Sequence, residues 1–197
     1  MTDGRGAAQR RRWAAADALT YNVARLLAEP PGSSRTYRVS GVMLDLGEDL
    51  RQSDPVEGTV RVSRTNRGLL LGGHLDAALA TECSRCLRPI DVPIEIEIAE
   101  EVLPSIDIAT GLPVTTSAEP DVARLTPAHE LELEPIVRAA IQLAEPIAPV
   151  CRADCPGLCS VCGLDLTDNP HGHDEEPIDP RLESLRAFRV DGEPENR

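Results

Sequence analysis

The chain has 197 residues and a formal net charge of −13 at pH 7. This length suits one ordinary domain with a core of its own, so disulfides are not needed for folding. The negative charge repels nucleic-acid phosphates, and one tryptophan, two tyrosines and one phenylalanine offer almost no stacking surface. The composition therefore excludes a general nucleic-acid-binding protein.

The N-terminal segment, residues 1–19, is basic and is predicted to be a flexible tail. It lacks the continuous apolar run and the cleavage site of a signal peptide, and no part of the chain is apolar and long enough to span a bilayer. We therefore expect a cytoplasmic protein without a membrane partner. If RNA is bound, the contact should be local and use arginine clusters such as Arg10 to Arg12.

Residues 20–103 are predicted to form a β-rich core. A short helical pattern comes first and breaks at Pro30-Pro31-Gly32. Four runs of alternating apolar and polar residues follow, which indicates strands with one buried face. The stretch "CSRCLRP" separates the last two runs and should connect a hairpin. The apolar positions of the four runs are Tyr37 and Val39; Val56, Val60 and Val62; Leu71, Leu75, Ala77 and Leu79; and Val92, Ile94, Ile96 and Ile98.

Residues 104–130 contain scattered prolines without a period and are predicted to be a flexible Pro-rich loop. Residues 131–190 should complete the same domain with a helix, a cysteine-rich loop and a C-terminal helix. Pro135 suits the first position of the helix, and Pro146 ends it. Residues 191–197 are predicted to be a disordered tail. The helix residues expected to face inward are Ile136, Val137, Ala140, Ile141 and Ala144, and in the C-terminal helix Leu182, Leu185 and Phe188.

These elements predict an α+β fold. It consists of an antiparallel sheet of about four to six strands, packed by one or two helices. A C-terminal cysteine-rich zinc-binding loop completes it.

Four of the six cysteines are concentrated in "CRADCPGLCSVCG". A reducing compartment disfavours disulfides, and four thiolates at this spacing suit a tetrahedral Zn²⁺ site. Such a site has no open position for water or substrate, so we expect structural zinc and no catalysis. The predicted ligands are Cys151, Cys155, Cys159 and Cys162.

The second pair, Cys83 and Cys86, leaves alternatives open. It could join Cys159 and Cys162 in a split C-x2-C…C-x2-C ribbon, but the local cluster closes a much shorter loop and is preferred. Otherwise the pair could be a redox dithiol or could simply pack at the hairpin end. His171 and His173 are assigned to a polar loop because four sulfurs suffice for zinc.

The motifs "ECSRCLRPI", "LEPIVRAAIQLAEPIAPVCRADCPGLCSVCGLDL" and "DPRLESLRAF" make residues 20 to 190 resemble the YceD family of large-subunit ribosomal RNA accumulation proteins. The resemblance implies a cytoplasmic, non-enzymatic ribosome biogenesis factor that promotes accumulation of large-subunit rRNA. The expected partners are that rRNA, a basic ribosomal protein, or both, in an immature large subunit. No small-molecule substrate is expected.

The charge distribution sharpens this expectation. The acidic body suits a basic ribosomal protein, while Arg85 and Arg88 beside the hairpin cysteines could touch rRNA phosphates. Two other functions remain as alternatives. One is a thiol-disulfide oxidoreductase that uses Cys83 and Cys86, and the other is a zinc-dependent regulatory module, which lacks a basic recognition helix.

Overall fold

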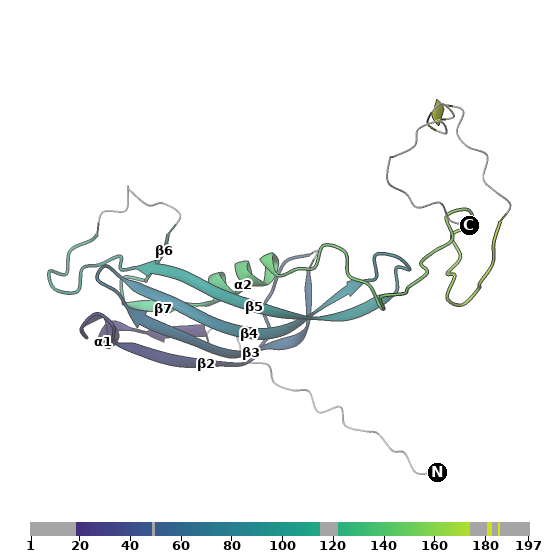
Figure 1. The fold of residues 1–197 in the computed structure, drawn as a ribbon. Helices are drawn as coiled ribbons and strands as arrows, with labels where there is room; N and C mark the ends of the chain where they lie inside the picture. The colour runs from purple at the N-terminus through teal and green to yellow at the C-terminus, as the bar shows by residue number, and fades with distance from the viewer. Residues whose placement is uncertain (1–18, 49, 115–121, 174–180, 183–184, 186–197) are drawn as a thin grey trace, which may run out of the picture.

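A five-stranded sheet with the strand order β2-β3-β4-β5-β6 dominates the computed structural model (Figure 1). The structure describes residues 19–48, 50–114, 122–173, 181–182 and 185. The strands of this sheet are β2 (Ser34–Val42), β3 (Arg51–Arg64), β4 (Leu69–Glu82), β5 (Pro89–Leu103) and β6 (Ala123–Arg124).

The sheet is mixed and not purely antiparallel as predicted. Strands β2 to β5 are antiparallel, but β6 runs parallel to β5 and pairs only with Val102 and Leu103. A two-residue strand has no alternating pattern, so the sequence gives no sign of it. The α+β class and the predicted hairpin between β4 and β5 are confirmed.

The predicted alternation of the strands is confirmed in the core. Ile94, Ile96 and Ile98 of β5 are buried, whereas Glu95 and Glu97 between them are exposed. Alternate residues of a strand point to opposite faces, so one face packs inward and the other is solvated. The buried residues of the other strands include Val39, Val56, Val60, Val62, Leu71, Leu75 and Leu79.

The helix α2 (Glu134–Leu143) packs against the apolar face of the sheet, next to β5 (Figure 1). Pro135 lies in its first turn, and the helix ends before Pro146, as predicted. Val137 and Ile141 are fully buried, and the remaining residues of its predicted inward face pack against the same core.

A smaller unit covers one end of the sheet. It consists of β1 (Thr20–Asn22), α1 (Ala24–Leu27) and β7 (Glu130–Glu132), and β1 and β7 pair antiparallel. Leu19 is only 1% exposed and belongs to the core, so the predicted tail of residues 1–19 does not extend to this residue. Residues 1–18 lie outside the described residues.

Parts of the predicted flexible loop, residues 104–130, contain regular structure or contact the sheet. Its end contains β6, and Leu125 after it is 2% exposed and donates its N–H to the carbonyl of Leu103 at 3.0 Å. Ile106 and Pro113 form an isolated antiparallel bridge. These anchors involve single residues and have no period, so the sequence reads as a loop. Residues 115–121 lie outside the described residues.

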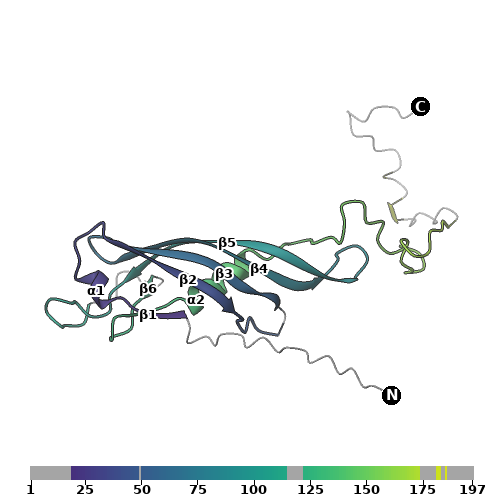
Figure 2. The same cartoon turned by 90° about the horizontal axis from the view of Figure 1, so that it is seen from below.

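The cysteine-rich segment, residues 151–173, lies beyond the tip of the β4–β5 hairpin (Figures 1 and 2). Its regular structure is limited to turns and an isolated bridge between Leu158 and Asp165. Most of the predicted C-terminal helix and tail lie outside the described residues. Leu182 and Leu185, which were expected to face inward, are 53% and 60% exposed. Neither described helix has the length and apolar character needed to cross a membrane.

Candidate metal centres

Backbone hydrogen bonds dock the cysteine-rich segment on the β4–β5 hairpin loop. Ser84 donates its N–H to the carbonyl of Pro149 at 2.8 Å, and Leu158 donates its N–H to the carbonyl of Arg85 at 3.0 Å. The guanidinium of Arg85 donates to the carbonyl of Cys155 at 2.9 Å. Cys83 and Cys86 of the loop are thereby brought to the first half of the segment.

The first metal centre consists of Cys83, Cys86, Cys151 and Cys155, whose sulfurs all lie within 4.8 Å of one another. The Sγ atoms of Cys83 and Cys155 are 3.9 Å apart, and those of Cys86 and Cys151 are 3.8 Å apart. Four sulfurs about 2.3 Å from one tetrahedral ion are separated by about 3.8 Å, whereas a disulfide needs about 2.05 Å. All six cysteines are free thiols. The geometry therefore fits a metal ion and no disulfide.

The electrostatics of this centre also favour a cation. The N–H of Cys151 lies 3.4 Å from the Cys83 sulfur, and this contact, with the N–H of Cys86, lowers the pKa of Cys83 to about 6. The side chain of Cys155, together with desolvation, raises the pKa of Cys151 to about 12. Neighbouring thiols thus resist joint ionisation, and a divalent ion would offset half of the charge of four thiolates.

The second metal centre consists of Cys159, Cys162, His171 and His173, whose ligand atoms also lie within 4.8 Å of one another. The Sγ atom of Cys162 is 3.1 Å from Nε2 of His171. The N–H groups of Cys162 and Val161 lower the pKa of Cys159 to about 6, which favours its thiolate form. Two thiolates and two imidazoles are one of the standard ligand sets of tetrahedral zinc.

A second hydrogen bond orients His171 for this role. Its Nδ1 lies 2.6 Å from the carbonyl of Asn169, and only the tautomer protonated on Nδ1 can donate to that oxygen. In that neutral tautomer the lone pair is on Nε2, which lies 3.1 Å from the Sγ atom of Cys162. Metal-binding histidines are commonly fixed by such a bond from the other ring nitrogen.

The two C-x2-C turns have the same backbone hydrogen bonds. Leu87 donates to the carbonyl of Cys83 at 2.9 Å, and Gly163 donates to that of Cys159 at 2.8 Å. Each first cysteine also donates to the residue five positions later, at 2.8 Å in both turns. The residue after the second cysteine has a left-handed backbone, with φ of 59° at Leu87 and 73° at Gly163. One turn type therefore supplies two ligands to each centre.

The predicted cluster of four consecutive cysteines is divided between these two centres. Cys151 and Cys155 lie with Cys83 and Cys86, while Cys159 and Cys162 lie with the two histidines. The alternative split ribbon of Cys83, Cys86, Cys159 and Cys162 is not brought together either, because its two cysteine pairs lie in different centres. The argument from loop length did not consider that the sheet already holds Cys83 and Cys86 in place. Much of the entropy of the long loop is therefore lost before the centre forms.

His171 and His173 were missed as candidate ligands because the prediction counted sulfurs and stopped at four. A usable signal was present in the sequence. A C-x2-C turn ends at Cys162 and an H-x-H pair begins at His171. One short loop between them can bring the two pairs together. The spacing of both pairs is compatible with a single local site.

Arg85 and Arg88, the predicted RNA contacts, both bind other parts of the chain. Arg85 contacts the carbonyls of Ala153 and Cys155. The guanidinium of Arg88 forms ion pairs with Asp165, at 2.6 Å, and with Asp168. Arg88 thereby connects the hairpin with the loop of the second centre. Contact of either arginine with RNA stays a prediction, and Arg10 to Arg12 lie outside the described residues.

Each centre has four candidate ligands and is closed in the chemical sense. Full occupation by its own side chains leaves no coordination position for a water nucleophile or a substrate. Such a centre can fix the conformation of the surrounding chain, here a segment with little apolar core of its own. The three buried cysteines of the first centre pack with Ile90 in a cluster separate from the main core.

Comparison with known proteins finds one matching family model and several related mycobacterial proteins. The family model for "Large ribosomal RNA subunit accumulation protein YceD" matches residues 71–189. Uncharacterized proteins of Mycobacterium bovis and Mycobacterium tuberculosis are each 32% identical over 173 residues, which is 86% of this chain and 81% of theirs. One of Mycobacterium leprae is 32% identical over 126 residues, covering 64% of this chain and 55% of its own.

No solved structure gives a significant match to the chain. The family match includes both C-x2-C turns and all eight candidate ligands, since these lie between Cys83 and His173. The chain belongs to the YceD family, as the sequence motifs predicted.

Proposed function

We propose that this chain is a zinc-stabilised, non-enzymatic ribosome biogenesis factor of the cytoplasm. It promotes accumulation of large-subunit rRNA by binding that rRNA, a basic large-subunit ribosomal protein, or both. The observation that carries the proposal is the match to the YceD family over residues 71–189. The description of that family supports a ribosome-associated role.

Two features of the chain support a binding function over catalysis. Both metal centres have a full set of four candidate ligands, which favours structural zinc. The net charge of −13 favours a basic protein partner, because opposite charges speed association and exclude wrong partners. The sulfur-rich first centre also favours zinc over magnesium or calcium, which prefer oxygen ligands.

A thiol oxidoreductase is the second candidate, and the lowered pKa of Cys83 favours it. A reactive cysteine, however, needs access to its substrate. Cys83 has 0% exposure and Cys86 has 5%, and two further thiols surround them. If the pair were catalytic, the metal-free protein would reduce a disulfide substrate, and C83S/C86S would abolish that activity. The proposed function predicts no such activity in the metal-loaded protein.

Deletion of the gene tests the proposed function. We expect a lower ratio of large- to small-subunit rRNA, restored by the wild-type gene and not by C83S/C86S. The matched control is Ser84→Ala, which retains every candidate ligand and the N–H bond to Pro149 and loses only the hydroxyl bond to the same carbonyl. An unchanged rRNA ratio in the deletion strain would reject the proposal.

A further inference from the structure

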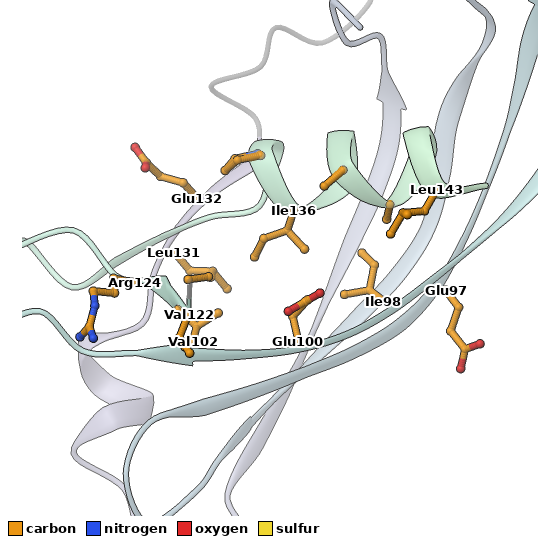
Figure 3. Close-up of a pocket in the computed structure, with 14 residues that line it drawn as sticks. Glu97, Ile98, Glu100, Val102, Val122, Arg124, Leu131, Glu132, Ile136 and Leu143 are labelled. Atoms are coloured by element: carbon orange, nitrogen blue, oxygen red, sulfur yellow. The ribbon is translucent and has the colours of Figure 1, made fainter. Parts of the chain in front are cut away.

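An apolar groove of about 400 Å³ lies between α2 and β5, away from both metal centres. Ile98 and Val102 of β5 line one side, and Ile136 of α2 lines the other (Figure 3). β6 lies at one end of the groove, and Leu143, which is 89% exposed, lines it on α2. Side chains of a partner could therefore bury against this space.

The groove borders a strand edge that is mostly unpaired. β5 has 15 residues, and β6 pairs with only Val102 and Leu103. In the described part of the chain, no other strand pairs with that side of β5. A long open edge is a ready template for an added strand.

The direction of the β5 peptide groups can be derived from one hydrogen bond. The carbonyl of Leu103 accepts the N–H of Leu125 on the β6 side, at 3.0 Å. Peptide groups alternate along a strand, and the register with β4 is unbroken from Pro89 to Val102. The odd-numbered residues Glu97 and Ala99 therefore direct their N–H and C=O groups toward the open edge.

The groove extends across this edge. Glu97 and Ile98 point to opposite faces of β5, yet both line the groove (Figure 3). A segment beside β5 would therefore meet the outward peptide groups and the apolar side chains of Ile98 and Ile136 together. Main-chain pairing combined with pockets for alternate side chains is how sheets bind extended peptides.

The charge at the groove identifies the partner. Glu97, Glu100 and Glu132 line it, and no ion pair joins any of them to another described residue. Arg124 is the one basic residue among the described lining. Carboxylates repel phosphates, so the groove disfavours RNA and suits a cationic segment with apolar side chains.

We propose that this groove binds an extended segment of a basic protein, which adds as a strand to the open edge of β5. Alternate apolar side chains of the segment lie against Ile98 and Ile136, and lysine or arginine side chains between them face Glu97. The inference deepens the proposed function, and rests on it, by assigning a surface to the basic protein partner.

Fluorescence anisotropy tests the proposal. A labelled nine-residue peptide of alternating lysine and valine is added to the full zinc-loaded chain, and its binding is measured. Saturable binding is expected, with at least tenfold weaker affinity for the lysine–serine analogue. Ala139→Arg, at an exposed position in the groove, should weaken binding at least tenfold. The matched control Gln142→Arg, exposed on the same helix outside the groove, should change it less than twofold. N-methylation of alternate peptide amides should abolish binding in one register and leave it in the other.

Several results would overturn the proposal. These are no saturable binding, equal binding of the valine and serine peptides, equal effects of the two arginine substitutions, or tolerance of methylation in both registers. A tenfold gain in peptide affinity on deletion of residues 1–18 would instead assign the groove to this chain's own basic segment. A dimer that Ala139→Arg dissociates would assign it to a second copy.

The rRNA ratio of the deletion strain separates this inference from the proposed function. Peptide binding in a protein whose deletion leaves rRNA unchanged would reject the function and retain the groove. A strong rRNA defect with no peptide binding would retain the function and reject the groove.

Discussion

The two metal centres use the same cysteine turn in different surroundings. In the first centre, Cys83 and Cys86 come from the hairpin loop of the sheet, and Cys151 and Cys155 come from the chain after α2. Three of its four sulfurs are buried. In the second centre all ligands lie within residues 159–173, and none is buried.

This difference indicates different structural roles. The first centre joins the cysteine-rich segment to the sheet, so a bound metal would stabilise a contact between distant parts of the chain. The second centre closes a local loop, so a bound metal would stabilise only that loop. The free energy of metal binding at each centre would add to the folding stability of the part of the chain that the centre holds in place.

The largest expected effect is that of C83S/C86S. This variant should lose one equivalent of metal and release residues 151–173 from the hairpin, because the metal supplies on the order of 10 kcal/mol at such a site. Trypsin should then cleave rapidly after Arg152. Metal analysis and limited proteolysis measure both effects, and circular dichroism should show that the sheet persists.

The matched variant C159S/C162S should also lose one equivalent of metal. It should retain protection of the bond after Arg152, since the first centre stays intact. This pair of variants distinguishes the three ligand groupings. If C83S/C86S kept all its metal, the local cluster of four consecutive cysteines would be correct. Loss of all metal from each variant would contradict two independent centres.

Chelation should separate the two centres in time. The second centre has exposed ligands, whereas Cys83, Cys86 and Cys155 are shielded, so a chelator should remove metal from the second centre first. Metal release to a colorimetric indicator should therefore show two phases of equal amplitude. C159S/C162S should lack the fast phase. A single phase in the wild type would show that the two centres do not differ in their rates of metal release.

The left-handed residue of each turn gives a smaller effect. Gly163→Leu should lower the free energy of unfolding by about 1–2 kcal/mol, the usual cost of a left-handed conformation for a side chain with a Cβ. The reverse change Leu87→Gly should raise it by about 0.5 kcal/mol, since relief of strain exceeds the added chain entropy. Denaturant unfolding measures both free energies. If both variants changed the free energy of unfolding in the same direction, the two turns would not be equivalent.

The smallest expected effect concerns the link between the two centres. Arg88→Ala removes the ion pairs with Asp165 and Asp168, which are partly exposed, so we expect only a small decrease in the free energy of unfolding. The loss should shrink in high salt. Arg152→Ala is the control, because its pair with Asp154 is more exposed and should contribute less. A salt-independent loss would show that Arg88 acts by packing.

The sequence predicted those parts of the fold that repeat a pattern. Alternation along β5 and the spacing of Val137 and Ile141 on α2 were sufficient to identify the sheet and its covering helix. β6 and the anchor at Leu125 involve too few residues for a period, so the region from 104 to 130 was assigned to a loop.

The ligand types of the site were partly predictable, but their grouping was not. Cysteine spacing identified candidate metal-binding residues, whereas their grouping depends on which segments the sheet brings together. Cys83 and Cys151 are distant in sequence, and contacts such as the hydrogen bonds between Ser84 and Pro149 place them side by side. A local sequence motif has no information about such contacts.

Metal content of the reduced, freshly purified full chain tests the central claim most directly. We predict two equivalents of zinc per chain by elemental mass spectrometry, falling to one in both C83S/C86S and C159S/C162S. A protein that contains no stoichiometric metal and keeps the hairpin and residues 151–173 docked under strong chelation would contradict it.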